Sequence, residues 1–174
     1  MPRLTARQPG GGHMNAITML KHQHREVEAL FKQLHKARSG APRRNVFEKV
    51  ADALAVHSAI EEKHFYPAVK EKSTEEILLE SLEEHLAVKR VIADLLRLDG
   101  DDETFAAKVK VLEDEVTHHV EEEEEELFPR VERMFDDEAL ESLGEAMEDA
   151  QAALLQAGNP RESVRSEIGR AATI

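Results

Sequence analysis

Apolar side chains recur at alternating spacings of three and four residues along most of the chain, which is the pattern of helices that bury one face. Turns rich in Gly, Pro and Asp separate these stretches. The stretches cover about residues 15–39, 43–68, 73–98, 102–134 and 137–156. The pattern therefore predicts an all-α protein in which short turns connect five helices.

Polar residues interrupt the apolar stripe at one level in each of the first four predicted helices. The first and third helices carry a single histidine there, whereas the second and fourth carry a histidine and, one turn later, a glutamate. These stripe residues are His24, His57, Glu61, His85, His119 and Glu123. Residues one turn apart lie above one another on a helix, so each His–Glu pair points to the same side.

The first two helices resemble the next two. His57 and His119 each begin the pattern His-x-x-x-Glu-x5-Pro, and the spacing from His24 to His57 nearly equals that from His85 to His119. Two helical hairpins related by a pseudo-two-fold axis would form an up-down-up-down four-helix bundle. In that bundle all the polar stripe residues lie near one level of the core, and the fifth helix packs on the outside.

Length and composition favour one domain with irregular ends. A chain of 174 residues, 41% hydrophobic and 34% charged, is long enough for one proper core, and a second domain is not expected. We expect residues 1–13 to be a disordered leader, 14–135 the bundle, 136–158 an additional C-terminal helix and 159–174 a loose polar tail.

Charge and cysteine content argue against several classes of function. The net charge of −13 argues against nucleic acid and anionic membranes as partners, because phosphate binding needs clustered Lys and Arg. The chain has no cysteine, which excludes disulfides, iron–sulfur clusters and thiolate zinc sites, so any metal must be held by nitrogen and oxygen. Without a membrane-spanning apolar run or a signal peptide, we expect a cytoplasmic protein. We also expect a monomer or a weak homo-oligomer.

The stripe residues favour a metal site over packing. One histidine on an apolar face is usually a hydrogen-bonded core residue, but four of them together with two glutamates need another explanation. A buried carboxylate without a partner costs on the order of several kcal/mol, and the stripe offers no Lys or Arg to Glu61 or Glu123. Bound cations would neutralise both carboxylates and use the imidazoles as neutral ligands.

The number of candidate ligands favours two ions. Four histidines and two glutamates are too many for one tetrahedral zinc. They suit two ions with two histidines each, bridged by both glutamates, with a solvent-derived ligand between the ions. Imidazole and carboxylate without thiolate fit iron first, with manganese or zinc as alternatives.

The segments around these positions resemble the hemerythrin-like HHE cation-binding domain family. The resemblance covers about residues 15–134 and lies in HREVEALF, HSAIEEKHFYPAV, HLAVKRVI and HHVEEEEEELFPRV. It implies a hemerythrin-like four-helix bundle with two iron ions, oxo- or hydroxo-bridged, that bind dioxygen or related small oxidants. The ligands that the resemblance implies are His24, His57, Glu61, His85, His119 and Glu123.

The sequence departs from the oxygen-carrying hemerythrins at two places. Those proteins have a second histidine on the third helix, where this chain has Lys89. They also space their last histidine and acid as His-x-x-x-x-Asp, whereas this chain has His119-x-x-x-Glu123. The resemblance then implies an open position on both irons, which suits peroxide or nitric oxide chemistry, or iron sensing, as readily as oxygen transport.

Residues beside the predicted ligands leave alternatives open. His118 would replace His119 if the helix register slipped by one residue, although the matching distances to the prolines favour His119. Glu62 and Glu122 are candidates for extra ligands or for hydrogen bonds to the ligands, and solvent-facing salt bridges are the favoured interpretation.

Tyr66 is the single tyrosine of the chain and precedes a proline near the predicted site. It is a candidate to donate a hydrogen bond to a ligand. Its counterpart in the second repeat is Phe128, which favours apolar packing instead.

The favoured function is a di-iron protein that binds or reduces a small oxidant such as O2, H2O2 or NO, and an enzymatic form would be catalase-like decomposition of peroxide. The alternative is an iron- or oxygen-sensing module that signals to a protein partner, with the fifth helix and the tail as its output. A metal-free structural bundle is disfavoured by the buried carboxylates.

Overall fold

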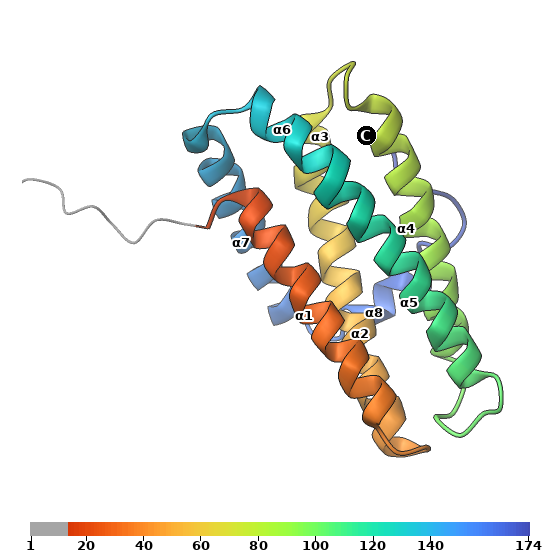
Figure 1. Cartoon of the computed structure of the whole chain (residues 1–174). Helices are drawn as coiled ribbons and strands as arrows, with labels where there is room; N and C mark the ends of the chain where they lie inside the picture. The colour runs from red at the N-terminus through yellow and green to blue at the C-terminus, as the bar shows by residue number, and fades with distance from the viewer. Residues whose placement is uncertain (1–13) are drawn as a thin grey trace, which may run out of the picture.

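The computed structural model describes residues 14–174, and every regular element in this part is helical. The leader predicted for residues 1–13 lies outside the described residues. The elements are α1 (Ala16–Lys36), α2 (Ala41–Ile60), η1 (Glu61–Phe65), α3 (Tyr66–Val69), α4 (Glu75–Leu95), α5 (Phe105–Glu122), η2 (Glu123–Leu127), α6 (Phe128–Met134), α7 (Asp137–Ala157) and α8 (Arg161–Val164). Helices α1, α2, α4 and α5 form the bundle, which confirms the predicted fold class (Figure 1).

The core of the bundle consists of two apolar clusters, one on each side of the polar level. On α1, Leu20 belongs to one cluster and Val27 to the other, and His24 lies between them. Helices α2 and α4 repeat this order around their own histidines. The polar level is therefore enclosed by apolar packing from both ends of the bundle.

A π-helical turn lies in each repeat and begins at the glutamate of the stripe. Segment η1 starts at Glu61 and η2 at Glu123. In both, the backbone N–H of the residue after the segment, Tyr66 or Phe128, donates to the carbonyl oxygen of that glutamate, five residues earlier. A proline follows immediately in both repeats. The wider turn accommodates the proline ring, so the helix continues past the proline.

Helix α7 packs against α1 and α2, outside the four helices of the bundle (Figure 1). Leu140 and Met147 are buried in the contact. Gly144 allows the close approach, because a Cβ there would lie 1.9 Å from the carbonyl oxygen of Met14. The fifth helix is thus in contact with two helices that carry stripe residues.

Residues 159–174 differ from the loose tail expected from the sequence. They contain α8, in which Val164 is fully buried in the apolar core. Arg161 forms ion pairs with Asp52 at 2.6 Å and Glu48 at 3.2 Å, both on α2. The other apolar residues of this segment that pack against the core lie beyond α8, and they are Ile168, Ala171, Ala172 and Ile174. The anchor is made by contacts with other helices and not by a continuous amphipathic helix, which is why the sequence did not reveal it.

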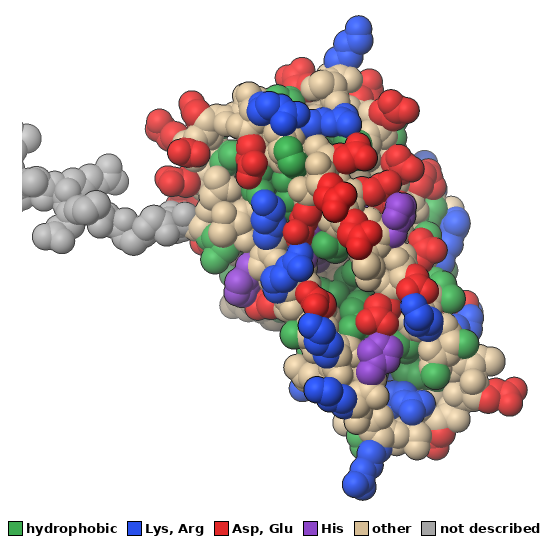
Figure 2. Space-filling model, in the orientation of Figure 1, with side chains coloured by type: hydrophobic (Ala, Val, Ile, Leu, Met, Phe, Trp, Pro, Cys, Tyr) green, Lys and Arg blue, Asp and Glu red, His purple; other side chains and the backbone are tan. Residues whose placement is uncertain are grey.

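The surface is strongly charged, as the net charge of −13 requires. On the face shown in Figure 2, acidic side chains crowd around the end near α6, and apolar side chains show between α1 and α5. Among the described residues, no helix combines the length and the apolar character needed to cross a membrane.

Candidate metal centre

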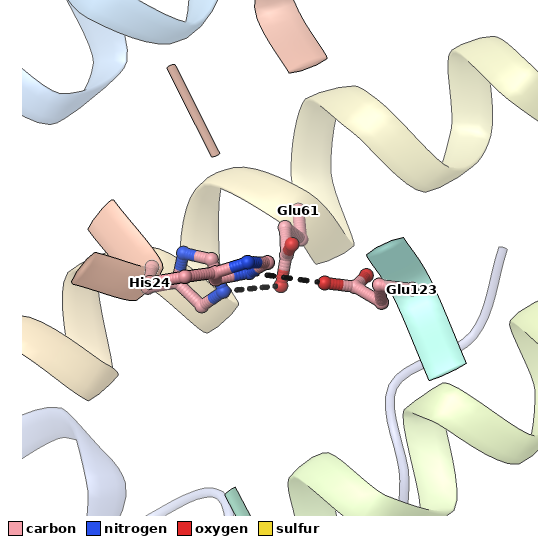
Figure 3. Close-up of side chains that lie close together, drawn as sticks. His24, Glu61 and Glu123 are labelled. Atoms are coloured by element: carbon pink, nitrogen blue, oxygen red, sulfur yellow. Dashed lines mark ion pairs between the residues drawn. The ribbon is translucent and has the colours of Figure 1, made fainter. Parts of the chain in front are cut away.

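The polar level of the core brings together all six residues predicted as ligands. They are His24 from α1, His57 from α2, Glu61 from η1, His85 from α4, His119 from α5 and Glu123 from η2. Each is at most 5% exposed, and the two glutamates are fully buried. Figure 3 shows His24, Glu61 and Glu123 pointing toward one another from three elements that lie far apart in the sequence.

The four imidazoles form two pairs. The ring centroids of His24 and His57 lie 4.9 Å apart, and those of His85 and His119 lie 4.7 Å apart. In the second pair the two Nε2 atoms approach to 3.1 Å. Each pair combines one histidine from the first helix of a repeat with one from the second helix of the same repeat.

The two carboxylates lie between the pairs. Glu61 Oε2 is 3.3 Å from Nε2 of His57 and 3.2 Å from Nε2 of His85, so it contacts both pairs. Glu123 Oε2 also contacts both pairs, at 3.3 Å from Nε2 of His24 and 3.6 Å from Nε2 of His119. The candidate ligand atoms within each group lie within 4.8 Å of one another, so these groups are able to hold metal ions.

Every histidine of the centre donates from Nδ1 to an oxygen outside it, which leaves Nε2 facing inward. The donor–acceptor pairs are His24–Glu124 at 2.8 Å, His57–Gln23 at 2.7 Å, His85–Glu62 at 2.9 Å and His119–Glu84 at 2.8 Å. Bonds of this kind hold the ring orientation and the tautomer that a metal-binding histidine needs.

The four acceptors occupy equivalent positions in the two repeats. Gln23 and Glu84 each immediately precede the first histidine of a repeat, and Glu62 and Glu124 each follow the second histidine by five residues. Each of them holds a histidine of the partner helix or repeat. Sequence reasoning missed Gln23, Glu84 and Glu124, because each contacts a histidine of another helix and no spacing within one helix marks it.

Glu62 is not the solvent-facing residue that the sequence favoured. Its side chain is 9% exposed and accepts from His85 Nδ1 and from Lys89 Nζ, the latter at 2.8 and 2.9 Å. Lys89 Nζ also pairs with Glu167 at 2.8 Å, on the segment that follows α8. Lys89 therefore lies outside the ring of candidate ligands and neutralises a carboxylate that holds one of them.

His118 lies outside the centre, on the surface of α5. Its side chain is 62% exposed, and its Nε2 lies 3.5 Å from Glu122 and 3.6 Å from Glu84. His119 points into the core instead, which agrees with the register favoured by the sequence. Glu122 belongs to the outer group with His118 and not to the centre.

Tyr66 reaches the centre, whereas the sequence favoured apolar packing for it. Its hydroxyl donates to Glu123 Oε1 at 2.9 Å and lies 3.3 Å from His85 Nε2. The ring stacks on His85 with centroids 5.5 Å apart. Phe128 stacks on His24 in the equivalent way, so the two aromatic rings beside the centre differ by one hydroxyl group.

Burial controls the charges of the centre. Burial and the neighbouring Glu123 carboxylate raise the pKa of Glu61 well above its usual value. Burial also opposes the ionisation of Glu123, but the imidazoles of His119 and His24 outweigh it and lower the pKa of Glu123. Burial lowers the pKa of His57 well below its usual value. The protein by itself therefore does not favour two anionic carboxylates at this level.

Four buried polar atoms of the centre have no hydrogen-bond partner among the described residues. They are His24 Nε2, His57 Nε2, Glu61 Oε1 and Glu123 Oε2. Unpartnered buried polar atoms are rare and costly in proteins. Imidazole nitrogens and carboxylate oxygens are also the donor atoms that bind divalent and trivalent metals, so the residues present fit cations at this level.

A small cavity adjoins all four histidines. Its volume is about 20 Å³, and apart from Ser58 and the imidazoles its lining is Val and Leu. A cavity of this size holds about one water-sized molecule. A larger groove of about 360 Å³ lies between α1 and α5, is lined in part by His24, and opens on the face shown in Figure 2.

Comparisons with known proteins found a matching family, a similar sequence and a similar fold. The profile of the family described as hemerythrin HHE cation binding domain matches residues 15–131. A DNA nickase of Nostoc sp. is 26% identical over 118 residues, which are 68% of this chain and 34% of that protein, so the chain spans about a third of its length. The crystal structure of a hemerythrin HHE cation binding domain-containing protein from Mycobacterium kansasii matches with a TM-score of 0.73 and 24% identity, over 88% of this chain and 99% of the other.

Proposed function

The chain belongs to the hemerythrin HHE cation-binding family, and on this premise we propose that it is a non-haem di-iron protein that binds or reacts with small oxidants such as O2, H2O2 or NO. The observation that carries the proposal is the pair of fully buried carboxylates that each contact one histidine of both imidazole pairs.

Two ions account for the geometry better than one. Each imidazole pair directs two Nε2 atoms inward, and the carboxylates Glu61 and Glu123 lie between the pairs. One ion would leave part of this donor set unpartnered in the core, which is costly. The nitrogen and oxygen donors without thiolate favour iron, with manganese or zinc as alternatives.

The chain's own residues supply the environment for small molecules. Bound iron would provide a redox couple and open positions for an oxidant. The small cavity beside the histidines limits the size of what can approach, and its apolar lining disfavours charged molecules. Tyr66 O–H holds Glu123 Oε1 and lies close to His85, so a proton donor is present on one side of the centre.

A sensory function is the second candidate, and one observation favours it. Two chains of hydrogen bonds lead from the centre to elements beyond the bundle. His57 bonds Gln23, which bonds Gln151 on α7; His85 bonds Glu62, which pairs with Lys89 and, through it, with the segment after α8. Iron-dependent protection of the α7 amides from hydrogen exchange would support this candidate, and unchanged exchange there would remove it.

DNA cleavage is not part of the proposal. The name of the Nostoc relative describes action on DNA, but this chain spans only about a third of that protein. The net charge of −13 of this chain also disfavours binding to the phosphates of DNA.

The proposal is tested by metal analysis of protein purified without chelators. We expect two irons per chain and an absorption spectrum that changes on exposure to air, peroxide or NO. Glu61→Ala and Glu123→Ala are expected to abolish iron retention, whereas Glu122→Ala, in the outer group, retains it. A folded protein that holds no metal, or equal losses in all three variants, would refute the proposal. Oxygen release from peroxide then decides whether the reaction is catalase-like.

A further inference from the structure

The two halves of the centre differ in one of the groups that hold the imidazoles. Gln23 accepts from His57 at 2.7 Å, and Glu84, at the equivalent position of the second repeat, accepts from His119 at 2.8 Å. An uncharged amide therefore holds one histidine, and a carboxylate holds the other.

The remaining pair of acceptors is matched in charge. Glu124 holds His24 and also pairs with Arg25. In the half formed by His85 and His119, Glu62 holds His85 and pairs with Lys89. Because each of these carboxylates has a basic partner, the difference in charge between the halves comes from Gln23 and Glu84.

The orientation of Gln23 is held by α7. Its side chain is buried, and Nε2 donates to Oε1 of Gln151 at 2.5 Å. A His57 that binds a metal through Nε2 carries its proton on Nδ1, so Gln23 presents its amide oxygen there and its NH2 group to Gln151. The amide acceptor is thus built into the packing between α1 and α7.

A carboxylate acceptor strengthens a metal-binding imidazole more than an amide does. A hydrogen bond from Nδ1–H to an anion is about twice as strong as one to a neutral oxygen. It draws the Nδ1 proton outward and makes Nε2 a better donor to the metal, and changes in such partners alter metal affinity by about 10- to 100-fold. The half that contains Glu84 has this advantage for both of its histidines.

We propose that the two ion positions differ in affinity: the position formed by His85 and His119 holds its ion tightly, the position formed by His24 and His57 exchanges its ion, and Gln23 sets the difference. This inference rests on the two-ion centre proposed above. The exchangeable position is also the one beside the groove of about 360 Å³ between α1 and α5, because His24 lines that groove. Gln23 and Glu84 are positioning residues, since they act through His57 and His119.

The test measures iron release from the full chain. Protein loaded anaerobically with ferrous iron is mixed with a coloured ferrous chelator, and the absorbance is followed with time. We expect two release phases of equal amplitude in the wild type. Gln23→Glu is expected to slow the fast phase by about 10- to 100-fold, and Glu84→Gln to accelerate the slow phase by a similar factor.

Charge-matched controls separate this effect from general electrostatics. Gln33→Glu and Glu83→Gln change the charge equally at exposed positions of α1 and α4, and both should leave the two phases unchanged. If circular dichroism shows that Gln23→Glu does not fold, Gln23→Met removes the acceptor instead and should accelerate the fast phase.

Two outcomes separate this inference from the proposed function. Two bound irons that leave in a single phase, with a rate unaffected by the changes at Gln23 and Glu84, would overturn the inference and leave the di-iron proposal intact. A protein that binds no iron, or one iron per chain, would overturn both.

Discussion

Lys89→Met tests whether the ion pairs behind His85 hold the centre together. Lys89 is 7% exposed and its Nζ contacts both oxygens of Glu62, whose side chain is 9% exposed. Methionine fills a similar volume but removes the ammonium group. Glu62 would then keep only the imidazole of His85 as a partner.

The expected loss follows from burial. Removing one partner of a buried ion pair costs about 3–5 kcal/mol, because an uncompensated charge is left behind. The second pair of Lys89, with Glu167, adds little, because that carboxylate is 37% exposed and exposed pairs contribute about 0–1 kcal/mol. A chain of this length shifts its melting temperature by about 2–4 °C per kcal/mol, so we expect a fall of roughly 6–20 °C.

Urea unfolding of the metal-free protein, followed by circular dichroism near neutral pH, measures the loss. Lys108→Met is the matched control, because Lys108 pairs with Asp94 at 3.0 Å where the two side chains are 37% and 52% exposed, and we expect it to cost less than about 1 kcal/mol. Combining Lys89→Met with Glu62→Gln should recover most of the stability, because neither charge then remains. If Lys89→Met costs no more than Lys108→Met, the burial argument is wrong.

Three further predictions concern the centre itself. Tyr66→Phe should destabilise the metal-free protein by about 1.5–3 kcal/mol in urea unfolding, because Glu123 loses a hydrogen-bond donor. The ring packing remains possible, as Phe128 shows in the other repeat. No measurable change would mean that the hydroxyl does not donate to Glu123. Glu61→Gln should stabilise the metal-free protein increasingly as pH rises above about 4.5. Because the pKa of Glu61 is raised in the folded protein, wild-type stability is fully present below the unfolded-state pKa and is lost as pH rises through the folded-state pKa. A gain in stability that is the same at every pH would contradict this. Removal of iron by a chelator should lower the melting temperature of the wild type but not that of Glu61→Ala. The fall should grow with the iron concentration before removal, because iron that binds only the folded chain stabilises it by mass action. Equal melting temperatures with and without iron would exclude binding linked to folding.

The candidate ligands and the helices that carry them were predictable because both depend on spacing within one helix. A polar residue in an apolar stripe is visible at its own position, and a His and a Glu one turn apart project from the same side. The repeat added the information that the polar levels of four helices coincide. His119 rather than His118 follows from the same logic, and the structure buries His119 while leaving His118 exposed.

The hydrogen-bond partners of the candidate ligands were not predictable in this way, because they come from neighbouring helices. Glu62 follows Glu61 and Glu122 precedes Glu123, so an α-helix turns them about 100° to opposite sides of the stripe. Helix α4 presents Lys89 and His85 to Glu62, whereas Glu122 faces the outer group around His118. Which side lies against a neighbouring helix is decided by the packing, and the Glu62 side chain is 9% exposed whereas that of Glu122 is 25% exposed.

The sequence by itself determined the helical bundle, the repeat and the six inward-facing candidate ligands, since each follows from periodicity along a single chain segment. Only the tertiary structure decided which oxygen holds each imidazole, that the hydroxyl of Tyr66 reaches Glu123, and that the C-terminal residues are anchored on α2 and α4. These contacts join residues far apart in the sequence, so they exist only once the helices have packed at particular distances and rotations.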